Sequence, residues 1–349
     1  MNIVIRVDAS TSIGSGHLMR CVALATKLRH KGATVKFISA VLPGDMFQIL
    51  ESHGFEYAQL ASNVSESQEA DATCTQQTIY SLFKNSPDWL IVDHYALDAK
   101  WERLLQSQVK KLMVIDDLAN RAHVCDMLLD QNYYSDAELR YQHLLPTQCR
   151  TFLGPAYLLL RDEFYEARKY AKVRSGKVKR ILVFFGSSDT TNQTQTVIES
   201  IMQLNRRDII FDIVVGNSNP NRHKIAEQCQ LGINMNFHCQ INYIAELMLN
   251  ADLAIGAGGS AMWERCFLGL PSITVIFASN QERTTKDFSD AGGIHFLGWA
   301  TGLSAASYLQ VIKDFLDQPH LVRELSQKCL NFIHPSPDAV AESILSIDS

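Results

Sequence analysis

Residues 6–21 read RVDASTSIGSGHLMRC, and this stretch decides the fold of the first half of the chain. An apolar strand leads into a turn of small polar residues that contains Gly14 and Gly16, and His17 follows directly. Apolar residues then recur at helical spacing, which predicts a helix over 17–31. A strand, a glycine-rich turn and a helix in this order are typical of the opening unit of a doubly wound α/β domain.

The same alternation continues through the rest of the first half. Its strands are continuous apolar runs, as expected for parallel strands that helices cover on both faces. The expected strands lie at 3–8, 34–40, 89–95, 111–117 and 126–132, and the expected helices lie at 17–31, 44–53, 76–85 and 98–108.

A charged segment, EARKYAKVRSGKVKR at 166–180, interrupts this pattern before it starts again. The later strands are expected at 180–186, 211–216, 233–238, 253–257, 271–277 and 294–299, and the helices at 193–204, 221–230, 243–250, 260–268 and 283–291. The α/β chain should therefore form two doubly wound Rossmann-like domains, with ligands in a cleft that the carboxyl ends of the strands line. We expect the first domain at 1–167, a linker at 168–180, the second domain at 181–334, and a C-terminal helix within 335–349 that packs back on the body.

Composition excludes several classes of protein. The 349 residues are 46% hydrophobic and 20% charged, which is ordinary for a globular protein, and the net charge of −5 gives no electrostatic basis for binding nucleic acid or an anionic membrane. No apolar run approaches the ~20 residues of a membrane span, and no signal peptide is evident. The eight cysteines show no CxxC spacing and fit buried thiols in a reducing compartment. We expect a cytoplasmic protein, a monomer, with no membrane span.

The GSGH turn allows two interpretations. Its glycines permit positive φ and close approach of the backbone, and the helix start offers free N–H groups to an anion. A dinucleotide fingerprint would need a third glycine where His17 stands and an acidic residue after the second strand. The alternative is a tight turn with a histidine near the helix cap.

Further polar residues follow the next strands of the first half. Asp93, His94 and Tyr95 come at the end of a buried strand, either as site residues or as an entry to a helix that Asp98 caps. Asp116 and Asp117 could bind a metal or exchange protons, and they could equally cap a turn.

In the second half, residues 254–271 read AIGAGGSAMWERCFLGLP. A strand enters a turn with Gly258 and Gly259, Ser260 opens a helix, and Glu264 lies one turn inside it. Backbone amides of such a turn suit a pyrophosphate, and a glutamate at this position can accept hydrogen bonds from ribose hydroxyls.

Two other loops come after strands of the second half. FASNQE at 277–282 offers Asn280 and Gln281 to a sugar, or it simply caps a helix. FFGSSDTTN at 184–192 either lines a phosphate path or is a turn in which Asp189 or Thr190 caps the next helix. The eleven histidines show no HExxH or HxH spacing, so no metal or other cofactor is expected.

In this order, six motifs resemble a known family. They are RVDASTSIGSGHLMRC, DHYALD, IDDLANR, LGPAYLLLRDEF (153–164), FFGSSDTTN and ASNQE. The family is that of the UDP-2,4-diacetamido-2,4,6-trideoxy-β-L-altropyranose hydrolases (PseG). These enzymes belong to the biosynthesis of pseudaminic acid, which is a nonulosonic acid of surface glycans. It lies within the GT-B or MurG-like superfamily, and the resemblance covers nearly the whole chain. Residues after about 303 extend beyond the shortest members, and we assign them no role beyond packing.

The resemblance implies a role for each matching residue. His17 would be the catalytic base on the N-terminal, sugar-binding side, and the C-terminal domain would bind UDP. Substrate-binding residues would be Gly14, Gly16, Asp8, Tyr95, Asn280 and Gln281, and UDP-binding residues would be Gly186, Ile244, Gly259, Ser260, Ala261 and Glu264.

The implied reaction needs a positioned, partly deprotonated water more than it needs a general acid, because UDP is a good leaving group. Partners would be the UDP-activated diacetamido sugar and water, and attack opposite the leaving group predicts inversion. Two alternatives stay open: a MurG-like UDP-sugar glycosyltransferase, whose acceptor hydroxyl would replace the water, and a nucleotide-sugar binding protein without chemistry.

Overall fold

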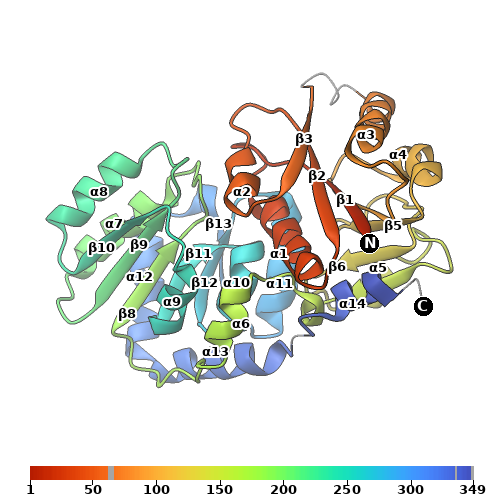
Figure 1. The fold of residues 1–349 in the computed structure, drawn as a ribbon. Coiled ribbons are helices and arrows are strands. Elements are labelled where there is room, and N and C mark those ends of the chain that lie inside the picture. The colour runs from red at the N-terminus through yellow and green to blue at the C-terminus, as the bar shows by residue number, and fades with distance from the viewer. Residues whose placement is uncertain (62–66, 335, 347–349) are drawn as a thin grey trace. The chain divides into compact units, whose positions relative to one another are not determined.

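The computed structural model describes residues 1–61, 67–334 and 336–346 (Figure 1). The chain divides into two compact units, and each has its own parallel sheet. Unit 1 comprises Met1–Arg161 together with Pro335–Ser349, and unit 2 comprises Asp162–His334. The expected α/β class, with two doubly wound sheets of parallel strands, is confirmed.

The sheet of unit 1 has the strand order β3-β2-β1-β4-β5-β6-β7 among the described residues. Its strands are β1 (Asn2–Val7), β2 (Thr34–Ala40), β3 (Glu56–Leu60), β4 (Trp89–Asp93), β5 (Lys111–Ile115), β6 (Met127–Asp130) and β7 (Arg150–Leu153). Its helices are α1 (Gly16–His30), α2 (Phe47–Ser52), α3 (Gln68–Leu82), α4 (Ala99–Leu105), α5 (Ala137–Arg140) and α14 (Ala339–Leu345), with short 3₁₀ turns η2 (Gln106–Gln108) and η3 (Pro155–Tyr157).

Side chains that alternate along β1 form the two faces of this sheet. Ile3 and Ile5 are buried among apolar residues of α1, α2 and α14, whereas Val4 is buried among those of α3 and α4. Figure 1 shows α14 beside α1, and the indole nitrogen of Trp89 donates to the carbonyl of Ile344, 3.0 Å away. The C-terminal helix therefore completes the core of unit 1.

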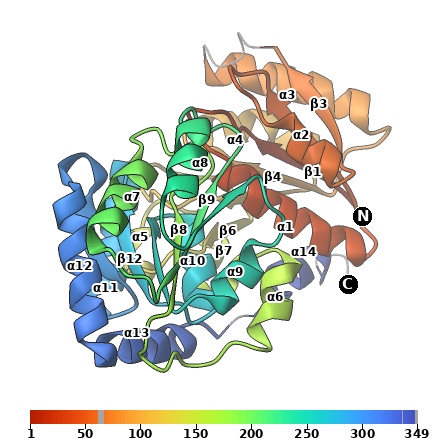
Figure 2. The ribbon, with the colours of Figure 1, turned by 90° about the vertical axis from the view of Figure 1, so that its left-hand side faces the viewer.

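The sheet of unit 2 has the order β10-β9-β8-β11-β12-β13, the same topology with one strand fewer; Figure 1 labels all of these strands and Figure 2 shows the sheet from another side. Its strands are β8 (Arg180–Phe184), β9 (Ile210–Val215), β10 (Met235–Cys239), β11 (Leu253–Ala257), β12 (Ser272–Ile276) and β13 (His295–Trp299). Its helices are α6 (Asp162–Arg168), α7 (Gln193–Leu204), α8 (Arg222–Leu231), α9 (Ile244–Asn250), α10 (Ser260–Phe267), α11 (Ser279–Asp290), α12 (Ala305–Asp317) and α13 (Pro319–Phe332), with the 3₁₀ turn η4 (Ala300–Gly302).

The division of the chain differs from the expected one at the linker. Residues 168–180 lie inside unit 2, because Arg174 is buried there and its guanidinium donates to the carbonyls of Ala251 (2.9 Å) and Leu268 (3.0 Å). Of the expected C-terminal helix, 335 and 347–349 lie outside the described residues, and the described part contains α14.

Several elements were not expected or begin elsewhere. The edge strands β3 and β7 were missed because their sequences, EYAQL and RTFL, are not continuous apolar runs. Helix α3 begins at Gln68 rather than at 76, since the Ser67 hydroxyl accepts from the Ala70 amide (3.1 Å) and caps a polar first turn. Helices α12 and α13 fill the region after 303, where Tyr308, Phe315 and Val322 join the core of unit 2.

Candidate functional site

The first candidate site lies at the carboxyl ends of β1 and β4, which are neighbours in the sheet of unit 1. The strand order reverses direction between these two strands, and this switch point is where open α/β sheets bind ligands. The connection after β1 turns at Gly14, whose φ of +85° favours glycine, and α1 begins at Gly16. The predicted residue His17 therefore stands in the first turn of α1.

His17 is held by a carboxylate from the neighbouring strand. Its Nδ1 atom lies 2.6 Å from Oδ1 of Asp93, the last residue of β4. Nη2 of Arg20 also lies 3.0 Å from Nδ1, but it donates at shorter range to Oδ1 of Asp93 (2.7 Å). An ionised carboxylate can only accept hydrogen bonds, so we assign the hydrogen to Nδ1, and Nε2 of the neutral ring keeps its lone pair. Within the described part of the chain, Nε2 of His17 has no hydrogen-bond partner.

Arg20 lies one helical turn after His17 and fixes the same carboxylate. Its Nε donates to Oδ2 of Asp93 (2.6 Å), its Nη2 to Oδ1 (2.7 Å), and its Nη1 to Oδ2 of Asp117 (2.9 Å). Burial by itself would raise the pKa of Asp93, but the charge of Arg20 and the hydrogen bond from His17 lower it well below its usual range. The pKa of Asp117 is lowered in the same way, with Arg20 overcoming burial.

Tyr95 completes this group from the loop after β4. Its ring meets the ring of His17 edge-on, with centroids 4.5 Å apart and an interplanar angle of 85°. The structure thus brings together two predicted site residues, His17 and Tyr95. Arg20 was not predicted, although its position three residues after His17 places it on the same face of α1.

Asp8, which follows β1, lies in a separate buried network. Its oxygens accept from the Arg6 guanidinium, from the Ala40 amide (2.7 Å) and from Nε2 of His94 (3.2 Å). The Ala96 amide donates to Nδ1 of His94 (3.1 Å), which leaves the hydrogen of the neutral ring on Nε2, directed at Asp8. Asp8 therefore ties β1 to β2 and to the loop after β4, and a direct contact with substrate stays a prediction.

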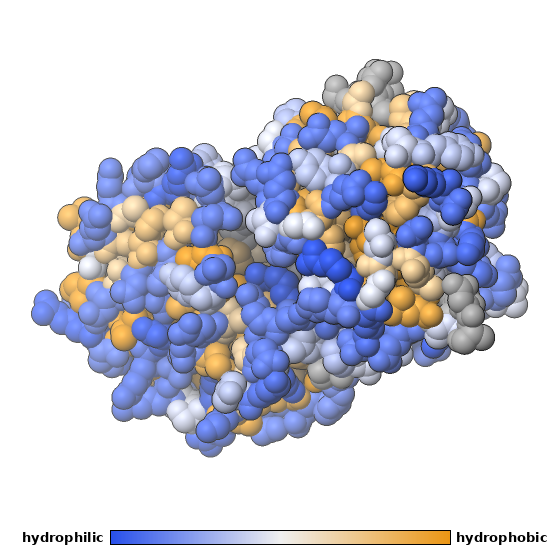
Figure 3. All heavy atoms as spheres, in the orientation of Figure 1, coloured by the Kyte–Doolittle hydropathy of each residue, from blue (hydrophilic) through white to orange (hydrophobic). Residues whose placement is uncertain are grey.

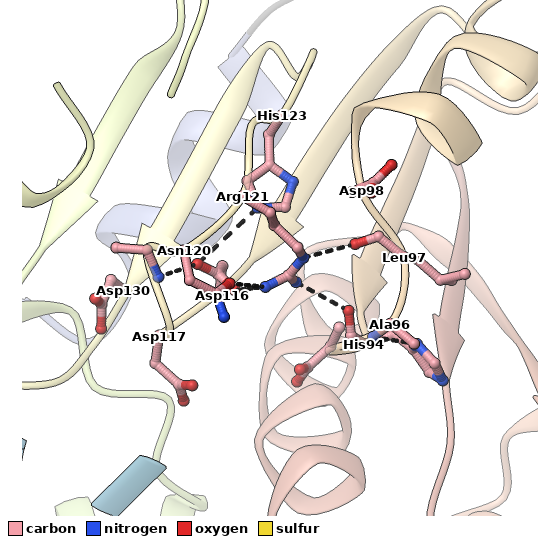
Figure 4. Close-up of polar contacts among 12 residues, drawn as sticks. His94, Ala96, Leu97, Asp98, Asp116, Asp117, Asn120, Arg121, His123 and Asp130 are labelled. Carbon is pink, nitrogen blue, oxygen red and sulfur yellow. Dashed lines mark hydrogen bonds and ion pairs between the residues drawn. The ribbon is translucent and has the colours of Figure 1, made fainter. Parts of the chain in front are cut away.

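The two aspartates after β5 have different partners, and Figure 4 shows the contact of Asp116 with Arg121. Asp117 pairs with Arg20, whereas Asp116 accepts from the Ala119 amide (2.9 Å) and from Nη1 of Arg121 (2.8 Å). The turn-capping interpretation therefore applies to Asp116. Among the described residues, no group of three or more His, Cys, Asp and Glu side chains is arranged to hold a metal ion.

The second candidate site lies at the corresponding switch point of unit 2, between β8 and β11. Gly186 follows β8 with a φ of +91°, and Gly259 caps α10 with a φ of +77°. The side chain of Gln281, from the first turn of α11, lies against this glycine turn, since a Cβ on Gly258 or Gly259 would be 3.5 Å from its amide atoms. The structure thus brings together the predicted residues Gly259 and Gln281.

The other predicted residues of unit 2 occupy helix starts around the sheet. Ser260 and Ala261 open α10, Glu264 follows one turn later, and Asn280 lies in the first turn of α11. Ile244 begins α9 and is buried. In the loop after Gly186, the Asp189 carboxylate accepts from the amides of Gln193 (2.9 Å) and Thr194 (2.8 Å), so Asp189 caps α7, one of the two roles considered for that loop.

The face shown in Figure 3 is mostly hydrophilic, with smaller hydrophobic patches. None of the described helices is long and apolar enough to cross a membrane.

Comparison with known proteins gives one match within unit 2 and others that span most of the chain. Residues 180–328 match the glycosyltransferase family 28 C-terminal domain. Over 84% of its length, the chain is 27% identical to the UDP-2,4-diacetamido-2,4,6-trideoxy-β-L-altropyranose hydrolase of Campylobacter jejuni, and the match covers 97% of that protein. The predicted resemblance is confirmed.

The chain is also similar to a second relative, which is longer, and to a solved structure. The chain is 26% identical over 82% of its length to an uncharacterized protein of Methanocaldococcus jannaschii, but it spans only 58% of that protein. Its fold is similar to the crystal structure of MurG from Acinetobacter baumannii, with a TM-score of 0.67 at 15% identity and 99% of both chains covered. The MurG-like architecture expected from the motifs is therefore confirmed.

Proposed function

We propose that this protein is a nucleotide-sugar hydrolase that removes UDP from UDP-2,4-diacetamido-2,4,6-trideoxy-β-L-altropyranose. The products would be UDP and 2,4-diacetamido-2,4,6-trideoxy-L-altrose, an intermediate of pseudaminic acid biosynthesis. The substrate class rests on the similarity to the Campylobacter jejuni hydrolase. The chemistry rests on one observation: the Asp93 carboxylate orients His17 so that Nε2 keeps its lone pair at the switch point of unit 1.

In this mechanism, His17 is the general base. Its Nε2 atom takes a proton from water as the water oxygen forms a bond to the anomeric carbon. The bond between that carbon and the β-phosphate oxygen breaks, and its electron pair leaves with UDP. Asp93 stays ionised and stabilises the imidazolium, as the carboxylate does in a catalytic triad. Attack opposite the leaving group inverts the anomeric configuration.

Unit 2 would hold the nucleotide. The first amides of α10, at Ser260 and Ala261, lack partners within the helix and suit the pyrophosphate, whose charge the helix N-terminus favours. The positive φ of Gly259 and of Gly186 lets the backbone approach that group closely. Glu264 would bind the ribose, Ile244 the uracil, and Asn280 and Gln281 the sugar. The Ser260 and Ala261 amides would donate hydrogen bonds to the departing UDP and stabilise its charge without a metal.

A UDP-sugar glycosyltransferase is the second candidate, and the glycosyltransferase family 28 match in unit 2 favours it. In that reaction an acceptor hydroxyl replaces the water, while His17 and the nucleotide site keep their roles. The surroundings of His17 suit either nucleophile.

A panel of UDP-sugars tests the proposal. UDP release by the purified protein should occur in water alone, should be fastest with the diacetamido sugar, and should continue in EDTA. Proton NMR of the first product formed should show inversion at C1. Release that requires an added acceptor would establish the transferase instead, and binding without release would establish a binding protein.

A further inference from the structure

Arg121, in the loop after β5, joins two loops at the carboxyl edge of the unit 1 sheet (Figure 4). Its Nε donates to the carbonyl of Leu97 (2.9 Å) and its Nη2 to the carbonyl of His94 (3.1 Å). Its Nη1 donates to Oδ1 of Asp116 (2.8 Å). One planar guanidinium therefore binds both ends of the segment 94–97 and a carboxylate on the neighbouring connection.

The carboxylate end of this contact is firmly anchored. The Asp116 side chain is fully buried, and its other oxygen accepts from the Ala119 amide (2.9 Å) and lies 3.1 Å from the Tyr141 hydroxyl. Arg121 itself is only 14% exposed. Because Asp116 and Arg121 are both buried and hydrogen-bonded, Arg121 links the segment 94–97 to the connection that follows β5.

That segment carries Tyr95, whose ring packs edge-on against His17. The segment lies beyond the end of β4 and outside the strand ladder. Inside the segment, the Ala96 amide donates to the His94 ring (3.1 Å) and the Leu97 amide to the His94 carbonyl (3.4 Å). To the rest of unit 1 the segment is held by the two carbonyl contacts with Arg121 and by the contact of His94 with Asp8. The Tyr95 side chain itself hydrogen-bonds to Asp117, and Arg121 fixes the backbone on either side of Tyr95.

We propose that Arg121 is a positioning residue for the reaction: it holds the segment 94–97 so that Tyr95 fixes the imidazole of His17 and the sugar beside it. This role rests on the proposed hydrolase function. Arg121 makes no contact with His17, so it acts through Tyr95. Lysine cannot replace it fully, because an ammonium group lacks the fork that reaches two carbonyls and a carboxylate at once.

Kinetics of matched variants test the proposal. Arg121→Met should lower kcat for UDP release about 10- to 100-fold, since a displacement of about 1 Å can cost that much. KM should change less than about three-fold, because the nucleotide site lies in unit 2. Arg121→Lys should lie between Arg121→Met and the unsubstituted protein. The control is Arg29→Met, which removes another arginine that donates to loop carbonyls, those of His53 (2.9 Å) and Gly54 (3.3 Å), near the far end of α1.

A double-mutant cycle separates positioning through Tyr95 from a general loss of structure. If Arg121 acts through Tyr95, Arg121→Met should lower kcat less than about two-fold when Tyr95 is already alanine. If the two substitutions lower kcat independently, so that their fold-changes multiply in the double variant, the proposal is wrong. It is also wrong if kcat of Arg121→Met lies within two-fold of that of the unsubstituted protein.

Amide hydrogen exchange gives a readout that needs no activity. Exchange at residues 96–99 should become faster in Arg121→Met and stay unchanged in Arg29→Met. If the unsubstituted protein releases no UDP from any UDP-sugar, the hydrolase proposal fails, and the exchange result still decides whether Arg121 holds the loop. Unchanged exchange at 96–99 would overturn the role of Arg121 even in an active hydrolase.

Discussion

The Nδ1 atom of His17 and the Oδ1 atom of Asp93 are 2.6 Å apart, and this contact joins the first turn of α1 to the end of β4. Arg20 lies between Asp93 and Asp117 and pairs with both. With a neutral imidazole, the two carboxylates and the single guanidinium leave one negative charge. Uptake of a proton by His17 removes that charge, so this buried group accommodates the protonated histidine that general-base catalysis requires.

Replacing His17 by glutamine should abolish most of the turnover. The amide has no basic nitrogen, so water loses its proton acceptor, and kcat for UDP release should fall by about 10²–10⁴-fold. Binding of UDP, measured by isothermal titration calorimetry, should stay the same because the residues proposed to bind the nucleotide lie in unit 2. Turnover within ten-fold of the unsubstituted protein would remove His17 from the role of base.

Replacing Asp93 by asparagine should cost both activity and stability. The change leaves Arg20 with one buried carboxylate instead of two, and breaking a buried ion pair typically costs about 3–5 kcal/mol. The free energy of unfolding in urea should fall accordingly. The control is Asp88→Asn, in the same unit, where Asp88 pairs with the exposed Lys110 (2.7 Å) and accepts from the Asn2 amide (2.7 Å). Asparagine can still accept from that amide and the lost ion pair reaches solvent, so the loss should be about 1 kcal/mol or less. Equal losses in the two variants would contradict the importance of burial.

The sequence predicts the elements that place these groups better than it predicts the groups themselves. The apolar run of β1, the glycine turn and the periodic α1 are local patterns, so the position of His17 at a strand-to-helix turn follows from them. The role of Arg20 could not be predicted from such local patterns. The sequence predicts that a single arginine on a helix is exposed to solvent. The contact with Asp93 arises only because β1 and β4 pair in the sheet.

The boundary of unit 2 shows a second reason why the sequence did not predict parts of the structure. The segment 168–180 is charged and reads as a linker, yet Arg174 within it caps carbonyls at the ends of α9 and α10. Such a role depends on helices more than 70 residues away in the sequence. Hydrogen bonds to backbone carbonyls that are distant in the sequence leave no local sequence pattern. From its composition alone, such a segment is therefore predicted to be a linker.

Asp130, at the end of β6, should make stability depend on pH near neutrality. Burial and the charge of Asp117 raise the pKa of Asp130 to about 7, although Arg140 opposes the shift. In the unfolded chain an aspartate has a pKa of about 3.9. Between these values the folded state binds the extra proton, so the free energy of unfolding should decrease as pH rises from about 4 to about 7, by up to about 4 kcal/mol from this group.

The variant Asp130→Asn tests this dependence, because asparagine is uncharged throughout the range. Urea unfolding at pH 5 and at pH 8 should show a smaller decrease for the variant than for the unsubstituted protein. If both proteins lose the same free energy between the two pH values, Asp130 does not titrate there.

Gly256, in β11, should tolerate no side chain. A Cβ at this position would lie 2.3 Å from the carbonyl oxygen of Phe184 on the neighbouring strand β8 and 2.9 Å from Nη1 of Arg265. Backbone cannot yield as a flexible side chain can, so Gly256→Ala must separate β8 from β11. Overpacking of this kind typically costs about 1–3 kcal/mol. The cost should appear as a lower free energy of unfolding.

The matched control is Gly302→Ala, at the end of η4 in the same unit. Nothing lies within 4 Å of a Cβ there and φ is not positive, so this methyl group should change stability by less than about 1 kcal/mol. Because β8 and β11 flank the switch point that carries Gly186 and Gly259, Gly256→Ala should also weaken UDP binding, whereas Gly302→Ala should not. A Gly256→Ala protein that unfolds and binds UDP like the Gly302→Ala protein would show that these strands are not packed as closely as the structure has them, and it would remove the physical basis for placing the pyrophosphate at this edge.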